Sequence, residues 1–102
     1  MKTLDNKELH EIARRLTNEP FDGDRVFIEV DGHEIDGELL NYDATVELDP
    51  VEISPRTWER QEIVETRIRQ VELQFYYPDG SVKRVDYDES DLIRHIEHFI
   101  NN

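Results

Sequence analysis

The chain has 102 residues, of which 36% are hydrophobic and 36% carry a charged side chain. That length suits a single modest core, so we expect residues 1–102 to fold as one domain. Asp and Glu number 25 against 12 Lys and Arg, which gives a net charge of −13. Direct binding to nucleic acid or to anionic lipid is therefore disfavoured, because both present negative phosphates.

The sequence contains no cysteine, which excludes disulfide bonds, thiolate metal ligands and cysteine nucleophiles. The N-terminal residues become charged at once and lack the apolar core of a signal peptide. No segment approaches the roughly 18 consecutive apolar residues that a membrane-spanning helix needs. We therefore expect a cytoplasmic protein that does not associate with membranes.

The first predicted element is a helix from about Asn6 to Asn18. Its apolar residues recur at helical spacing and form one stripe: Leu9, Ile12, Ala13 and Leu16. Asp5, followed three residues later by Glu8, is typical of a capping box. Pro20 ends the helix, because the residue before a proline avoids the helical conformation.

Residues 25–30 alternate between apolar and polar side chains, which predicts a strand. Asp31-Gly32 follows and predicts a two-residue type I′ turn, which requires positive φ at both positions. With that turn the predicted cross-strand pairs are Val30 with His33 and Ile28 with Ile35.

The alternation changes phase at Asp36-Gly37, which is typical of a β-bulge. We therefore expect one long, bent strand from about His33 to Leu48. Its outward positions, which we expect to face water, are Asn41, Asp43, Thr45, Glu47 and Asp49.

Residues 49–61 are the least regular part, where Ser54-Pro55 indicates the start of a short helix. Residues 62–77 read as a second long strand, with a phase change that predicts a bulge near Arg69-Gln70. Pro78-Asp79-Gly80 predicts a three-residue hairpin loop. The corresponding pairs are Leu73 with Val85 and Val71 with Tyr87.

The last predicted element is a helix from about Ser90 to Ile100, capped by Asp88 or Ser90. Its apolar face consists of Leu92, Ile93, Ile96, Phe99 and Ile100. The order α-β-β-β-β-α predicts an α+β fold: a four-stranded, curved, mainly antiparallel sheet with both terminal helices packed on one face. The order of the strands in the sheet stays open.

No catalytic motif is present: the sequence lacks a G-x-S-x-G elbow, a phosphate-binding glycine loop and an H-E-x-x-H helix. His95 and His98 are three residues apart on the last predicted helix, but nothing fixes further ligands beside them. His33 is close in sequence to several carboxylates without the spacing of a calcium loop. We therefore predict no enzyme, no cofactor and no metal site. A cation-dependent protein or enzyme that uses His33 or His95 is an alternative hypothesis, the third after the two binding functions described below.

One candidate binding surface is acid-rich and consists of Glu34, Asp36, Glu38, Asp43, Glu47 and Asp49. Alternate residues of a strand are about 6.6 Å apart, comparable with the spacing of phosphates along a nucleic-acid strand. This surface is either a solvated face or an acidic mimic of nucleic acid that inhibits a basic DNA- or RNA-binding protein.

The other candidate surface is the loop from Pro50 to Gln61. Trp58 with Arg56 and Arg60 has the composition of binding hot spots. The alternative is that Trp58, the only tryptophan, folds back into the core. Tyr76 and Val82, on the outer face of the second hairpin, extend the contact patch.

The leading functional hypothesis is a non-catalytic module that binds another protein or a second copy of itself. The sheet face, a strand edge or the Trp58 loop would provide the contact. An unpaired edge in a small open sheet is a ready pairing site, which favours a homodimer.

Overall fold

The computed structural model describes residues 2–21, 23–52 and 64–101. The elements in chain order are β1 (Lys2–Thr3), α1 (Asn6–Leu16), β2 (Arg25–Ile35), β3 (Glu38–Glu52), β4 (Val64–Tyr76), β5 (Val82–Lys83), β6 (Val85–Asp86) and α2 (Glu89–Ile100).

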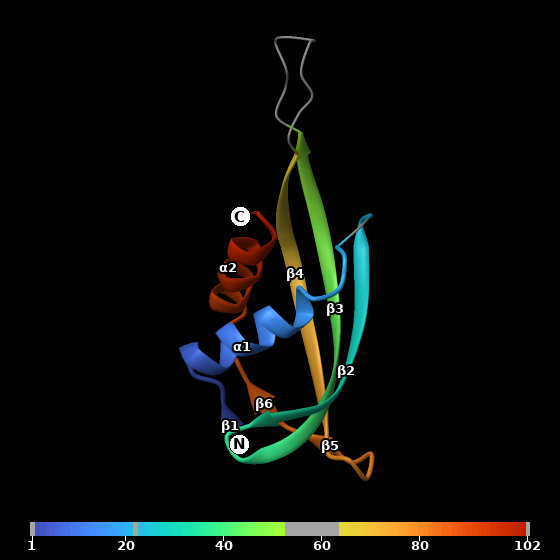
Figure 1. Cartoon of the computed structure of the whole chain (residues 1–102), viewed down its shortest axis with the longest axis vertical. Helices are drawn as coiled ribbons and strands as arrows, with labels where there is room; N and C mark the ends of the chain where they lie inside the picture. Colours follow the sequence, from blue (N-terminus) through green and yellow to red (C-terminus); the bar gives the residue numbers. More distant parts are fainter. Residues whose placement is uncertain (1, 22, 53–63, 102) are drawn as a thin grey trace.

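The main sheet is antiparallel, with strand order β2-β3-β4-β5. It is long and curled, and both helices lie on its concave side (Figure 1). The predicted α+β fold is therefore confirmed, with the helices on one face and neighbouring strands joined in chain order. The sequence patterns did not reveal a short parallel pair, β1 with β6, which holds the N-terminus beside the segment that leads into α2.

The two helices begin where their capping residues place them. In α1 the Glu8 N–H donates to the Asp5 carboxylate at 2.8 Å, and the Asp5 N–H donates to the Glu8 carboxylate at 3.0 Å. This capping box is the predicted one, although α1 ends at Leu16, two residues early. In α2 the cap is Asp88, whose carboxylate accepts from the Asp91 N–H at 3.1 Å.

The first hairpin turn was predicted at the wrong glycine. The chain reverses at Asp36-Gly37, where φ is 52° and 81°, and Ile35 lies opposite Glu38. This two-residue loop has positive φ at both central positions, as a type I′ turn requires. Consequently Val30 lies opposite Tyr42 rather than His33.

The predicted bulge lies instead at Asp31-Gly32. The pairing with β3 shifts between Val30 and His33. Gly32 has φ 69°, and its N–H donates to the Asn41 side-chain oxygen at 2.7 Å. Both Asp-Gly pairs can supply positive φ. The observed choice lets residues 25–30 and 33–35 of β2 pair with β3 in one long hairpin.

The second half of the sheet follows the predicted register more closely. Glu47 lies opposite Gln70 but Leu48 opposite Ile68, so the extra residue of β4 is Arg69, within the predicted bulge. The three-residue loop is also confirmed, because the Tyr77 N–H donates to the Ser81 carbonyl at 2.8 Å.

Beyond Lys83 the chain leaves β4, so the predicted strand pairs Leu73 with Val85 and Val71 with Tyr87 do not form. Val85 and Asp86 pair with β1 instead. Strand β3 continues past the predicted end at Leu48 to Glu52. The predicted short helix at Ser54-Pro55 lies outside the described residues.

The core fills the space between the concave side of the sheet and the two helices. From β3 it takes the whole predicted even-numbered series, all buried: Leu40, Tyr42, Ala44, Val46 and Leu48. The helices contribute Leu9, Ile12, Ala13, Leu16, Leu92 and Ile96. Within the described ranges, neither helix has the length and apolar character that crossing a bilayer demands.

Candidate functional site

Both helices lie on the concave side of the sheet and leave its convex side uncovered (Figure 1). Side chains alternate between the two faces of a strand, so the residues between the buried ones of β2, β3 and β4 point to this side. We call this surface the convex face. Its outward residues are Arg25, Phe27, Glu29, Glu34, Leu39, Asn41, Asp43, Thr45, Glu47, Gln70, Glu72, Gln74, Tyr76 and Val82.

Two carboxylates lie directly opposite each other at the centre of the convex face. Glu29 of β2 pairs with Asp43 of β3, and the next outward position along β3, Thr45, faces Glu72 of β4. Like charges directly opposite each other on one face of a sheet are destabilising. The centre of the convex face therefore concentrates negative charge at some expense in stability.

Arginines lie beside the carboxylates at the other end of this face. The Arg25 guanidinium is 3.7 Å from the Glu47 carboxylate, and the Arg69 guanidinium is 3.6 Å from the Asp49 carboxylate. Exposed ion pairs of this kind contribute little to stability. They do neutralise two members of the predicted acid-rich surface, so its negative charge is strongest around Asp43.

The convex face also carries exposed apolar side chains. Phe27 is 60% exposed, Leu39 54% and Val82 59%. Tyr76 is half-buried and lies opposite both Val82 of β5 and Asn41 of β3. Tyr76 and Val82 are thus cross-strand neighbours, and Leu39 lies two residues from Asn41 on the same side of β3. Exposed apolar groups with a polar surround are a feature of contact surfaces.

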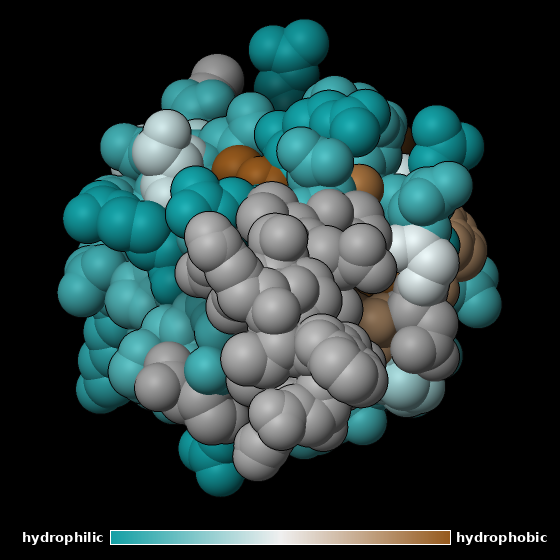
Figure 2. Space-filling model, turned by 90° about the horizontal axis from the view of Figure 1, so that it is seen from above, coloured by the Kyte–Doolittle hydropathy of each residue, from teal (hydrophilic) through white to brown (hydrophobic). Residues whose placement is uncertain are grey.

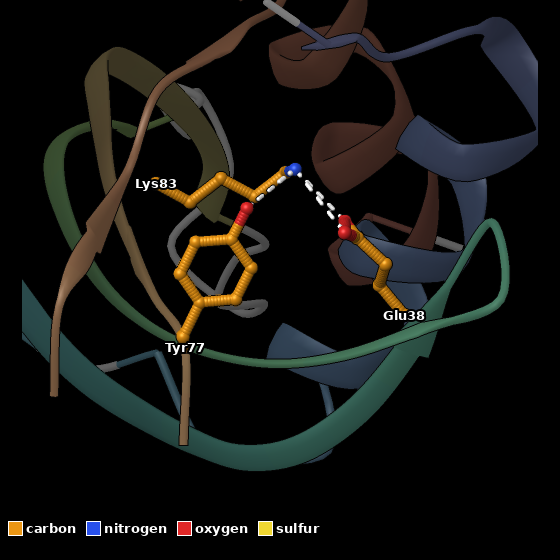
Figure 3. Close-up of polar contacts among 3 residues, drawn as sticks. All are labelled: Glu38, Tyr77 and Lys83. Atoms are coloured by element: carbon orange, nitrogen blue, oxygen red, sulfur yellow. Dashed lines mark hydrogen bonds and ion pairs between the residues drawn. The ribbon is translucent and has the colours of Figure 1, made fainter. Parts of the chain in front are cut away.

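Glu38 was predicted to lie on this acid-rich surface, but its carboxylate is engaged by Lys83 (Figure 3). The Lys83 ammonium is 2.8 Å from one Glu38 oxygen and donates to the Tyr77 hydroxyl at 3.1 Å. The hydrogen bond to Glu38, followed by that to Tyr77, raises the pKa of Lys83. Because only 15% of the Lys83 side chain is exposed, this contact ties β5 to the first residue of β3. Asp36 is placed in the turn before it.

The residues of the predicted Trp58 surface, namely Trp58, Arg56 and Arg60, lie outside the described residues. Viewed down the long axis of the molecule, most of the described surface is hydrophilic, with small hydrophobic areas between (Figure 2).

His33 is partly buried and is hydrogen-bonded to a core side chain. Its Nδ1 is hydrogen-bonded to the Tyr42 hydroxyl at 2.7 Å. Burial lowers the pKa of His33; neighbouring Glu11 opposes that shift and Arg15 adds to it. Burial likewise raises the pKa of Tyr42. This pair is a part-buried hydrogen bond between β2 and β3.

His95 bridges the two helices. Its Nε2 is hydrogen-bonded to the Asn6 side-chain oxygen at 2.8 Å, and its ring meets that of His10 edge to face with centroids 5.3 Å apart. Burial lowers the pKa of His95, and the nearby His10 acts in the same direction.

A hollow of about 320 Å³ beside His33 is lined by five carboxylates, those of Asp5, Glu8, Glu11, Glu34 and Asp36. Within the described ranges, no group of three or more His, Asp or Glu is arranged to hold a metal ion.

Sequence reasoning missed several residues of the convex face. Phe27 and Glu29 alternate with partly buried Val26 and with buried Ile28 and Val30 in β2, and Leu39 precedes buried Leu40, so the alternation itself was a usable signal. It also missed four side chains that cap the edge of β4, namely Tyr87, Glu89, Glu97 and Asn101.

Comparison of the chain with protein-family models, with curated proteins and with solved structures finds no match.

Proposed function

We propose that this chain is a non-catalytic protein-interaction module of the cytoplasm whose convex face binds a basic surface of another protein. One observation carries the proposal. Both helices cover the concave side, whereas in the part of the chain that the structure describes neither helix covers the opposite side of the three long strands (Figure 1). That side combines carboxylates with exposed apolar residues.

Charge complementarity gives the class of partner. The net charge of −13 and the carboxylates of Glu29, Asp43 and Glu72 favour approach of a positively charged surface. Charge mainly sets the rate and the specificity of such encounters, whereas apolar contact supplies much of the lasting affinity. Leu39, Tyr76 and Val82 are placed to provide that contact at one end of the convex face.

The opposition of Glu29 and Asp43 supports a binding role for the charge. A solvated face gains nothing from placing two carboxylates directly across from each other, because the arrangement costs stability. Residues that lower stability are commonly retained where they serve function.

A mimic of nucleic acid is the second hypothesis raised by the sequence, and it stays a prediction. A mimic needs an extended row of unneutralised negative charge. Here Arg25 and Arg69 lie beside Glu47 and Asp49, which supports a mixed contact surface with a local acidic centre.

The test is capture from a lysate of the native host with three forms of the protein. The face variant, Asp43→Asn with Glu72→Gln, removes two carboxylates from β3 and β4. The control variant, Glu11→Gln with Glu19→Gln, removes two exposed carboxylates elsewhere. We expect a basic protein that the wild type and the control retain and the face variant loses at least tenfold. Raising the salt concentration should weaken its retention.

A second variant, Leu39→Ser with Val82→Ser, tests the apolar part without changing the charge. We expect it to weaken retention of the same protein at low and at high salt concentration. Equal retention by all forms, or capture of no basic protein by the wild type, would contradict the proposal.

A further inference from the structure

The edges of the main sheet at β4 and at β2 differ in what pairs with their backbone groups. Past the point where β5 leaves β4, side chains fill the edge of β4. The backbone N–H groups of Thr66, Ile68, Val71 and Leu73 donate to Asn101, Glu97, Glu89 and Tyr87 at 3.2, 2.8, 3.0 and 3.1 Å. Strand β2 forms the other end of the sheet, and within the described ranges no strand pairs with its outer edge.

One hydrogen bond determines which residues of β2 present their backbone groups at that edge. The Leu48 N–H donates to the Asp24 carbonyl at 2.8 Å, and the same register continues through Val26 opposite Val46. Even-numbered residues of this stretch therefore direct their N–H and C=O groups towards β3. Arg25, Phe27 and Glu29 direct theirs away from the sheet.

Side chains on this stretch are complementary to a second copy of themselves. In an antiparallel pair of two β2 strands centred on Phe27, Phe27 lies opposite the partner's Phe27 and Arg25 opposite the partner's Glu29. By symmetry Glu29 lies opposite the partner's Arg25. Two opposite-charge pairs thus flank one aromatic pair, all on the convex side, and both kinds of cross-strand pair are stabilising.

Neighbouring registers lack this complementarity. Centring the pair on Glu29 places Glu29 opposite the partner's Glu29 and Phe27 opposite Asp31 of the partner subunit. Centring it on Arg25 places two arginines opposite each other. Centring it on Val26 places Phe27 opposite the partner's Arg25 and Glu29 opposite the partner's Gly23, and centring it on Ile28 places Phe27 opposite the partner's Glu29, so neither register combines an aromatic pair with two charge pairs. Registers centred between two residues fail for a different reason, because they place the outward backbone groups of odd-numbered residues opposite even-numbered residues, whose groups point into the sheet.

Exposure and strand shape fit the same register. Phe27 is 60% exposed, although aromatic side chains are usually buried by folding. The bulge at Gly32 changes the course of β2, so the regular part of the edge is the segment 25–30, centred close to Phe27.

We propose that two copies of this chain associate through the outer edge of β2, antiparallel about Phe27. Four strands from each copy then form one continuous sheet. This inference does not depend on a basic partner protein. The net charge of each copy opposes association, so we expect the dimer at physiological ionic strength, where repulsion beyond about 8 Å is screened.

Sedimentation over a range of protein concentrations tests the charge pairs. Arg25→Glu and Glu29→Arg should each weaken dimerisation at least tenfold, because each places like charges opposite one another. The doubly exchanged variant, Arg25→Glu with Glu29→Arg, should dimerise like the wild type. An equimolar mixture of the two single variants should form a heterodimer, because all four charges are then matched.

Control variants separate this effect from a change in net charge. Arg84→Glu and Glu19→Arg carry the same charge changes at exposed positions away from the β2 edge, and should dimerise like the wild type. Circular dichroism should show that every variant keeps the wild-type fold. A monomeric wild type, or single variants that dimerise normally, would overturn the proposal. It would also be overturned if neither the doubly exchanged variant nor the mixture of the two single variants formed a dimer.

Amide hydrogen exchange tests the backbone pairing directly. The N–H groups of Arg25, Phe27 and Glu29 should exchange more slowly as protein concentration rises. Those of Val26 and Ile28 should be protected at every concentration, because β3 already holds them. If the protection of the Arg25, Phe27 and Glu29 N–H groups does not change with protein concentration, this interface is excluded, even if a dimer forms elsewhere.

Discussion

The Glu97 carboxylate accepts a hydrogen bond from the Ile68 N–H at 2.8 Å and so joins α2 to the edge of β4. Three further side chains do the same at Thr66, Val71 and Leu73. These positions alternate along β4, with the step of three residues falling at the bulged Arg69. An unpaired strand edge is a template for aggregation. Here helix α2, its C-cap Asn101 and Tyr87, the residue before its N-cap, supply side chains at the positions that another strand would take.

Replacing Glu97 tests the contribution of this contact. Glu97→Ala leaves the part-buried Ile68 N–H without its acceptor, which should lower the free energy of unfolding by about 1–2 kcal/mol. Glu97→Gln keeps an amide oxygen at the same place and should cost less. Urea unfolding monitored by circular dichroism measures both variants. Equal stability of the alanine variant and the wild type would contradict a structural role for this hydrogen bond.

The bulge glycine gives a second prediction. Gly32 has φ 69°, a conformation that costs a residue with a side chain about 1 kcal/mol or more. Space is not the obstacle, because an added Cβ at this position meets no atom within 4 Å. Gly32→Ala should therefore lower the melting temperature, whereas Gly32→Asn should lower it less, because asparagine tolerates positive φ. Equal effects of the two substitutions would argue against a backbone cause.

How much of this structure the sequence could predict depended on whether the deciding contacts were local. The alternation in β3 and the loop at Pro78-Asp79-Gly80 fixed one strand's buried face and one hairpin register. The choice between Asp31-Gly32 and Asp36-Gly37 could not be made locally, because both dipeptides suit a type I′ turn. That choice was made by the pairing of β2 with β3 along its whole length.

Contacts between distant segments were beyond sequence reasoning for the same reason. Glu97 and Ile68 are 29 residues apart, and no spacing rule connects a helix carboxylate to the backbone of a strand. Glu38 occupies an even-numbered position of β3, opposite buried Ile35, and its side chain is 46% exposed beside Lys83. Its position in the alternation therefore differs from that of Asp43 and Glu47.

The opposed carboxylates of Glu29 and Asp43 predict a gain in stability when one charge is removed. Asp43→Asn and Glu29→Gln should each raise the free energy of unfolding by about 0.2–0.5 kcal/mol, because each relieves repulsion between directly opposite groups. The double variant should gain no more than either single one, because the repulsion is already gone. Urea unfolding of the four forms, combined as a double-mutant cycle, measures the coupling. Additive gains would show that the two carboxylates do not interact.

His33 predicts how stability changes with pH. Burial lowers the pKa of His33 in the folded protein, whereas an unfolded histidine titrates near about 6.5. The unfolded chain therefore binds more protons between these two pKa values, and folding weakens as pH falls from about 6.5 through the lower value. The stabilising contribution of neutral His33 is complete above that range.

His33→Gln should remove this part of the pH dependence while keeping a polar group near the Tyr42 hydroxyl. Stability measured by urea unfolding should thus fall less between about pH 7.5 and pH 5 in His33→Gln than in the wild type. His95→Gln is the informative comparison, because the pKa of His95 is also lowered by burial and its removal should flatten the curve in the same direction. Parallel curves for the wild type and His33→Gln would show that protonation of His33 does not oppose folding.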